Sequence, residues 1–416
     1  MSAFSLIALL LTLTALLAYL NYRLIRLPPT VGLMGLSLVF SLLLIGAGEL
    51  GLPLRGWAAK TIANVDFSEA LLNGMLSFML FAGALHVDVK ELREQKVAIA
   101  TLATFGVLIS TVLVGAGSWL LFGWLGLPIP LLACLTFGAL ISPTDPIAVL
   151  ALLKDAKAPI SLSTKIAGES LFNDGVGIVV FLVMFRSMFG GAAFAWEETA
   201  SLLVTEVCGG LAIGLIFGGL CFLMLKSVDN YRVEVMLTLA LVTGSYQLAS
   251  ALHASGPLAM VAAGLLIGNY GRKLAMSDTT RENLDNFWEL LDEILNGILF
   301  VLIGFEVLLL KIDPIYLLAA ALIIPLVLAA RLASLSVPAA VMHLAGRGGL
   351  PLSLLTWGGL RGGISIALAL TLPAGREHDV LLVATYAVVA FSILVQATTT
   401  PWVLRKTLAR PGPTMR

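Results

Sequence analysis

The chain has 416 residues, of which 59% are hydrophobic and 12% are charged. A soluble globular protein carries about 45–50% apolar and about 25% charged residues, so this chain has too little charge to cover a soluble fold with polar side chains. The low charge excludes a soluble enzyme, a disordered chain and a nucleic-acid-binding protein, which would need a basic surface, and leaves a polytopic membrane protein with short loops. Basic and acidic residues balance at 25 each, so the net charge says nothing about partners.

Apolar stretches long enough to cross a bilayer, which takes about 20 helical residues, recur along the whole chain. We therefore expect an all-α polytopic membrane protein with thirteen transmembrane helices, at residues 4–22, 30–50, 67–87, 97–124, 130–153, 162–188, 199–225, 231–252, 256–270, 287–310, 314–343, 350–373 and 380–404. If the seventh span is a linker, spans 1–6 and 8–13 have opposite orientations, which is the inverted-repeat arrangement of many secondary transporters.

The basic residues are distributed unevenly along this pattern. Eighteen of the 25 follow odd-numbered spans, five follow even-numbered spans, and Arg331 and Arg361 lie inside spans. By the positive-inside rule, the C-terminus is cytoplasmic and the N-terminus lies outside. Asp145, Glu169 and Asp174 also lie inside spans, and a charge within the membrane indicates a functional site.

The fifth span contains the sequence Ser-Pro-Thr-Asp-Pro within residues 142–147. Pro143 and Pro146 remove two main-chain donors and clash with the preceding turn, so we expect a broken helix there. Main-chain carbonyl groups freed near Thr144 can bind a cation, and Asp145 adds negative charge. A simple proline kink with a hydroxyl cap is the alternative.

The sixth span carries a polar face. Ser170, Asn173 and Asp174 share one side of a helix at spacings of three and four residues, whereas Glu169 points elsewhere. Asp145 and Asp174 each lie nine residues from a flanking lysine, or about 13 Å from the cytoplasmic edge at the helical rise. Such oxygen ligands suit a hard monovalent cation, Na⁺ or Li⁺, rather than a transition metal. The alternative is an aspartate held permanently in an ion pair.

A second broken helix is expected in the twelfth span, where four glycines surround Arg361 within residues 357–363. Where two broken helices cross, Asp145 can offset the positive N-terminal ends of the half-helices. Arg361 can offset their negative C-terminal ends.

Arg331 in the eleventh span is then free to pair with Glu169, although competition between Arg331 and the ion for Asp174 is the alternative. Three further acids stand at the cytoplasmic start of the tenth span, where a helix N-terminus favours negative charge and where they can shape a cation funnel: Glu289, Asp292 and Glu293.

Several strings of this sequence resemble the NhaP-type branch of the monovalent cation/proton antiporters, in the sodium/proton exchanger family. They are SPTDPIAV (142–149), AGESLFNDGVGIVVF (167–181), GPLAMVAAGLLIGN (256–269), the Arg331 segment and GGLRGGISIALAL (358–370). The resemblance implies a homodimer that works by an elevator-like movement of a core domain against a dimerisation domain.

On this resemblance, the dimerisation domain comprises residues 1–96 (helices 1–3) and 191–310 (the linker helix and helices 7–10). The ion-binding core comprises residues 97–190 (helices 4–6) and 311–404 (helices 11–13), and residues 405–416 form a short cytoplasmic tail.

The resemblance also assigns roles to residues of the predicted site. It implies that Asp174 binds cation or proton in turn, that Thr144, Asp145 and Ser170 help to bind the ion, that Asn173 supports the site, and that Glu169 pairs with Arg331. Related electrogenic antiporters have Asp in place of Asn173, which suggests electroneutral exchange of one cation for one proton. Many relatives carry an acid where this chain has Ala82, so a role for that acid is in doubt here.

The sequence thus predicts a secondary transporter, not an enzyme. It would exchange Na⁺ or Li⁺ for H⁺ in pH homeostasis in a bacterial inner membrane, without a cofactor. Its expected partners are a second copy and membrane lipids, with no nucleic acid and no soluble protein. A K⁺/H⁺ antiporter and a cation channel are alternatives. An intramembrane aspartyl protease using Asp145 and Asp174 is disfavoured, because neither lies in the GxGD context of such enzymes.

Overall fold

The computed structural model describes residues 3–50, 56, 67–156, 158–189, 196–311, 313–344 and 350–408. Throughout these ranges the regular structure is helical and contains no β-strand; one isolated antiparallel bridge joins Asp145 to Leu360. The expected all-α fold is therefore confirmed.

The N-terminal half contains eleven α-helices and three π-helical segments in the described residues. In chain order they are α1 (Ala3–Leu20), η1 (Asn21–Ile25), α2 (Pro29–Glu49), α4 (Phe67–Glu69), η2 (Ala70–Met75), α5 (Leu76–Leu85), α6 (Val89–Glu94), α7 (Lys96–Thr101), η3 (Leu102–Gly106), α8 (Val107–Trp124), α9 (Leu131–Leu140), α10 (Ile147–Asp155), α11 (Ile160–Phe189) and α12 (Trp196–Lys226).

The remaining helices continue the same pattern, with π-helical segments η4 and η6 and a 3₁₀ segment η5. They are α13 (Tyr231–Ala251), α14 (Gly256–Leu266), η4 (Ile267–Gly271), α15 (Arg272–Leu274), α16 (Asp278–Glu306), η5 (Val307–Leu309), α17 (Pro314–Ser334), α18 (Ser336–Leu344), α19 (Leu352–Trp357), α20 (Gly363–Leu370), α21 (Arg376–Phe391), η6 (Ser392–Gln396) and α22 (Ala397–Leu408).

Eight of the described helical stretches are long and apolar enough to cross a membrane. They are Ile7–Ile25, Pro29–Gly48, Lys96–Trp124, Ile160–Met188, Val204–Lys226, Tyr231–Ala251, Pro314–Leu344 and Arg376–Thr407, and shorter apolar helices lie at Leu76–Leu85 and Leu131–Leu140. The structure therefore supports a multi-pass membrane protein, while the number of thirteen crossings stays a prediction.

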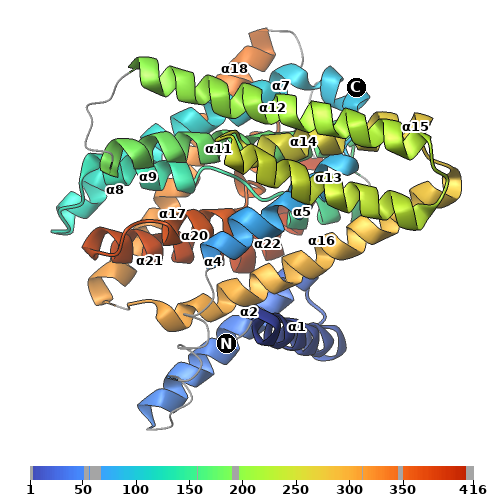
Figure 1. The fold of residues 1–416 in the computed structure, drawn as a ribbon. Helices are drawn as coiled ribbons and strands as arrows, with labels where there is room; N and C mark the ends of the chain where they lie inside the picture. Colours follow the sequence, from blue (N-terminus) through green and yellow to red (C-terminus); the bar gives the residue numbers. More distant parts are fainter. Residues whose placement is uncertain are drawn as a thin grey trace.

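The helices pack into two groups. In one group α8 packs on α9 and α17, α9 packs on α11, and α21 packs on α17 and α20. In the other, α16 packs on α1, α2, α5 and α13, while α14 packs on α5, α12 and α13. Figure 1 shows α1 and α2 along one side of the molecule and α12 towards the opposite side, with α9, α11 and α20 between them.

Both expected helix breaks are present. The helix of the fifth span stops at Leu140 and resumes at Ile147, and that of the twelfth stops at Trp357 and resumes at Gly363. Pro143 and Pro146 explain the first interruption, since neither can donate to the preceding turn. Glycines explain the second, because they lose the most backbone freedom on forming a helix.

The span predicted at 287–310 lies mostly within a helix that begins nine residues earlier. Helix α16 begins at Asp278, where Ser277 accepts a hydrogen bond from the Thr280 main-chain N–H and caps the helix. The charged first turns of this helix have the low hydropathy of a loop, which is why a count of apolar residues misses them. The expected tail at 405–416 is also partly helical, since α22 continues to Leu408, and the residues after 408 lie outside the described part.

Candidate functional site

The two interrupted spans cross and bond to each other through their main chains. The Asp145 N–H donates to the Leu360 carbonyl over 2.8 Å, which forms the isolated antiparallel bridge between them. Each break thus uses main-chain groups of the other in place of the helical bonds it has lost, as the absence of water in a bilayer core requires.

Arg361 strengthens this crossing. Its Nη1 donates to the carbonyl groups of Ser142 and Pro143, the latter over 2.9 Å, just beyond the C-terminal end of α9. Its main-chain N–H donates to Ser392 Oγ over 2.9 Å in the π-helical segment η6. The guanidinium group therefore lies where negative partial charge accumulates. It also occupies two freed carbonyl groups near Thr144 that the sequence left open for a cation.

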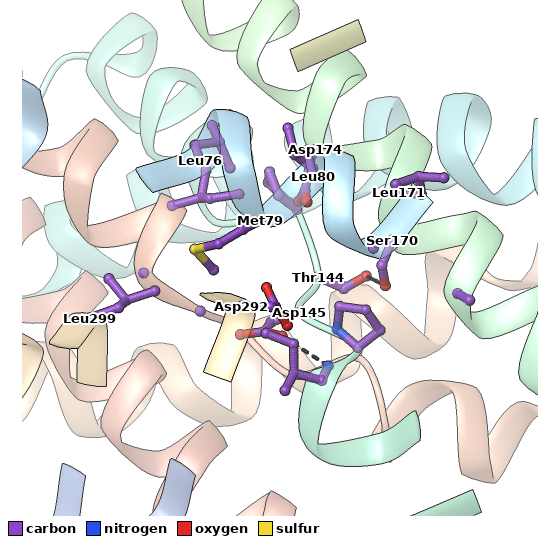
Figure 2. A pocket seen from close by; sticks show the side chains of 18 of the residues that line it. Leu76, Met79, Leu80, Thr144, Asp145, Ser170, Leu171, Asp174, Asp292 and Leu299 are labelled. Carbon is purple, nitrogen blue, oxygen red and sulfur yellow. Dashed lines mark hydrogen bonds between the residues drawn. The ribbon is translucent and has the colours of Figure 1, made fainter. Parts of the chain in front are cut away.

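Asp145 faces the opposite half-helix. Its Oδ1 accepts a hydrogen bond of 3.0 Å from the Ile147 N–H at the start of α10, drawn as a dashed line in Figure 2. This places the carboxylate at the positive end of the half-helix. A Cβ atom at Gly362 would lie 2.6 Å from Asp145 Oδ2, so glycine is the residue that admits the carboxylate here.

Three polar side chains link the first break to α11. Asn173 Nδ2 donates to Thr144 Oγ1 over 2.7 Å, and Asn173 Oδ1 accepts from the Thr144 N–H over 3.3 Å. Thr144 Oγ1 and Ser170 Oγ are 3.0 Å apart. Because Thr144 Oγ1 already accepts from the amide, its own hydrogen can go to Ser170, which leaves lone pairs on both hydroxyl groups for a cation.

Asp174 lies on the same face of α11 and is only 8% exposed. Across the described ranges it makes no hydrogen bond and no ion pair, although the negative charge of Asp145 acts on it. A buried carboxylate without a partner is costly in a membrane, where it calls for a proton or a cation. No group of the protein in the described ranges therefore compensates the charge of this carboxylate.

A cavity of about 290 Å³ joins these groups. Thr144, Asp145, Ser170 and Asp174 line it together with apolar side chains of α5 and α16, as Figure 2 shows. Asn173 does not line the cavity and acts on it only through Thr144. The oxygen atoms around the cavity are the kind that bind hard cations.

Glu169 points away from the cavity to Arg331. Arg331 Nη2 lies 2.5 Å from Glu169 Oε1, and both side chains are buried. Arg331 also donates to the Leu355 carbonyl over 3.4 Å. A Cβ atom at Gly359 would lie 2.8 Å from Arg331 Nε, so a second glycine of the twelfth span makes room for this pair. The alternative in which Arg331 competes for Asp174 is not the arrangement in the structure.

A third carboxylate enters the cavity from α16. Asp292 lines it alongside Asp145 and Asp174, whereas the sequence placed it only in a possible funnel at the membrane edge. The sequence pattern that could have indicated this position is a polar stripe on α16 at helical spacing, formed by Asp285, Glu289, Asp292 and Asn296. Ala82, where many relatives carry an acid, is buried in α5 and does not line the cavity.

Comparison with known proteins identifies the family of the chain. The family described as the sodium/hydrogen exchanger, transmembrane, matches residues 11–406. The chain is 50% identical over 398 residues to the Na⁺/H⁺ antiporter NhaP of Pseudomonas aeruginosa, covering 94% of each chain. It is 32% identical over 378 residues to the Na⁺/H⁺ antiporter NhaH of Halobacillus dabanensis, covering 89% of this chain and 91% of the relative.

The fold also matches a solved structure. The sodium proton antiporter MjNhaP1 of Methanocaldococcus jannaschii superposes with a TM-score of 0.75 at 20% identity, covering 98% of this chain and 99% of that one. At that identity the likeness concerns the fold, while the family is established by the sequence matches. The chain therefore belongs to the sodium/hydrogen exchanger family of transmembrane proteins.

Proposed function

We propose that this protein is a secondary antiporter that exchanges Na⁺ or Li⁺ for H⁺, with Asp174 binding the two ligands in turn. The observation that carries the proposal is the buried Asp174 carboxylate, which lines a cavity with the hydroxyl oxygens of Ser170 and Thr144 and has no protein partner in the described ranges. The names of the relatives, which are Na⁺/H⁺ antiporters, support the same activity.

One carboxylate is enough to couple the two fluxes. A proton on Asp174 removes the charge that attracts a cation, and a bound cation disfavours protonation. Each ligand neutralises the buried charge, so each allows the site to cross the membrane, whereas the empty charged site is held back by the cost of moving it through the bilayer. Exchange is thus obligatory.

We further propose an elevator-type movement in a homodimer. In this proposal α8, α9, α11, α17, α20 and α21 form the moving core, and α1, α2, α5, α12, α13, α14 and α16 form the dimerisation domain. The cavity supports the division, because its walls come from both groups, with Asp145 and Asp174 on one side and α5 and α16 on the other. The N-terminus would face outward and the C-terminus the cytoplasm of a bacterial inner membrane.

The same arrangement supports electroneutral one-for-one exchange. Asn173 is neutral and is occupied with Thr144, and Glu169 is occupied with Arg331. Asp174 is then the carrier of the exchanged charge, so one Na⁺ replaces one H⁺.

The test uses purified protein in proteoliposomes with an imposed pH gradient and a pH-sensitive dye. Na⁺ or Li⁺ should dissipate the gradient in wild-type vesicles, and Asp174→Asn should abolish this flux. Asp313→Asn is the matched control, because Asp313 caps α17 at the Ile315 N–H and lies outside the cavity. Flux retained in Asp174→Asn would refute the mechanism.

The same vesicles separate the alternatives. Dissipation by K⁺ in preference to Na⁺ would make the protein a K⁺/H⁺ antiporter. Cation uptake without proton counterflow would make it a channel.

A further inference from the structure

Asp292 is a charged group that the exchange described above does not use. It lies in the middle of α16, with its side chain half-buried in the cavity wall near Leu299. Its neighbour Glu293 is exposed and does not line the cavity. The helix therefore directs one of two adjacent acids into the cavity and the other away from it.

Asp292 faces Asp145 across the cavity. Figure 2 shows their side chains close together, and both line the cavity. Neither Asp145 nor Asp292 forms an ion pair with a basic residue anywhere in the described chain. Two carboxylates that face each other without a basic partner repel unless a cation or a proton lies between them.

The acids are not ligands of a single ion. Within the described ranges, no three acidic, His or Cys side chains come together closely enough to hold one metal ion. All three acids line the same cavity, and Figure 2 shows Asp292 beside Asp145. The cavity therefore offers two acidic positions, one at Asp292 and Asp145 and one at Asp174.

A second polar group stands beside Asp292 on α16, although it does not itself line the cavity. Asn296, one turn further along α16 and 4% exposed, donates to the Asp292 carbonyl over 2.9 Å, while its Oδ1 has no hydrogen-bond partner among the described residues. A buried amide oxygen without a donor beside a carboxylate is suited to a cation rather than to an anion.

We propose that Asp292 and Asp145 together form a first position for the transported monovalent cation, from which the ion passes to Asp174. The proposal rests on the proposed antiport function and adds a recruiting residue to it. Because Asp292 belongs to the dimerisation domain and Asp145 to the core, the first position exists only while the core lies on one side of the membrane. Asp292 then raises cation affinity on the side at which α16 begins and leaves the translocation step unchanged.

The experiment compares Asp292→Asn with wild type in the proteoliposome assay, over a range of Na⁺ concentrations. We expect the KM for Na⁺ to rise about tenfold, which corresponds to about 1.4 kcal/mol of lost attraction, with the maximal rate preserved. Asp292→Glu should recover most of the affinity, because it keeps the charge. Glu293→Gln, on the next residue of the same helix, should behave as wild type.

The side of the membrane on which Na⁺ is offered gives a second readout. In vesicles of uniform orientation, Asp292→Asn should raise the KM for Na⁺ offered on the side at which α16 begins, and not for Na⁺ offered on the opposite side. Size-exclusion profiles and thermal midpoints of the variants show whether each is folded, and the Asp292→Glu variant tests the charge if the Asn variant is unstable.

The failures are distinguishable. Wild-type vesicles that exchange no cation for protons would refute the proposed function and this inference with it. Active wild-type vesicles with an unchanged KM in Asp292→Asn would refute the inference alone. A loss of maximal rate at constant KM, not recovered in Asp292→Glu, would make Asp292 a structural residue and would also overturn it.

Discussion

Arg361 in the second interrupted span donates a hydrogen bond of 2.9 Å to the carbonyl group of Pro143 in the first. The contact joins segments that are far apart in the sequence, and the Arg361 side chain does not line the cavity that holds Asp174. The positive charge of the core is thereby committed to main-chain groups, which leaves the Asp174 carboxylate uncompensated.

Replacing Arg361 should lower the stability of the protein and not only the rate of exchange. Arg361→Ala removes the donor to the Ser142 and Pro143 carbonyls, and each buried carbonyl left unpaired costs about 1–3 kcal/mol. Arg361→Lys keeps one donor and should be intermediate. Thermal unfolding in detergent, followed by tryptophan fluorescence, measures the order of stability of wild type and the two variants. An alanine variant as stable as wild type would contradict it.

Glu169 and Arg331 should behave as a unit. Removing one partner of a buried ion pair costs about 3–5 kcal/mol, because the other charge stays buried, whereas replacing both with apolar residues is often near neutral. We expect Glu169→Leu and Arg331→Met to lower the melting temperature strongly when made singly. The double variant should recover much of the loss. If the losses in melting temperature of the two single variants simply add in the double variant, Glu169 and Arg331 do not act as a pair.

The Thr144 hydroxyl should set cation affinity. Thr144→Val removes an oxygen that contacts Ser170 and Asn173, whereas Thr144→Ser keeps it. We expect the valine variant to raise the KM for Na⁺ about fivefold, since a neutral hydrogen bond contributes about 1 kcal/mol. The serine variant should stay close to wild type. Equal KM values in both variants would argue against a role for the hydroxyl.

Gly362 should be intolerant of a side chain. Its Cβ would lie 2.6 Å from Asp145 Oδ2, so Gly362→Ala must displace the carboxylate. Displacement of a binding group by about 1 Å can lower a rate about a hundredfold. Gly244→Ala in α13 is the control, because nothing lies within 4 Å of its added carbon. Exchange rates in vesicles, with thermal midpoints alongside, distinguish a misplaced carboxylate from an unfolded protein.

Exchange should be insensitive to membrane potential. A potassium gradient with valinomycin imposes a voltage on the vesicles, and wild-type Na⁺-driven proton flux should stay the same at either sign. Asn173→Asp can still accept from the Thr144 N–H, so it should fold, and it adds a second protonatable group. Voltage-dependent flux in this variant, but not in wild type, is the expected result. Voltage dependence in wild type would refute electroneutral exchange.

Both helix breaks were predictable because their causes are local. Pro143 and Pro146 act on their own helical turn, and the glycines around Arg361 weaken theirs. The polar face of α11 was equally accessible, because helical spacing alone brings Ser170, Asn173 and Asp174 together. Features that depend on residues close together in one helix could therefore be predicted from the sequence.

Apart from the Glu169–Arg331 pair, contacts between distant segments could not be predicted from the sequence. Helical spacing shows which residues share the face of Asp292, but not that this face meets Asp145. The sequence predicted that Arg361 offsets the negative helix ends at the crossing, but that its side chain reaches the carbonyl groups of Ser142 and Pro143 depends on tertiary packing. The capped, charged beginning of α16 was missed because hydropathy detects only the part of a helix that meets lipid.

The bridge between Asp145 and Leu360 also bears on how the protein is made. During synthesis the first interrupted span enters the membrane while the second half of the chain has not yet been translated. The main-chain N–H of Asp145 then has no Leu360 carbonyl to which it can donate, and the carbonyl groups of Ser142 and Pro143 have no Arg361 donor. The newly inserted first half therefore carries unpaired main-chain groups, and the cavity is complete only after the second break, whose Gly362 and Gly363 line it, has been translated.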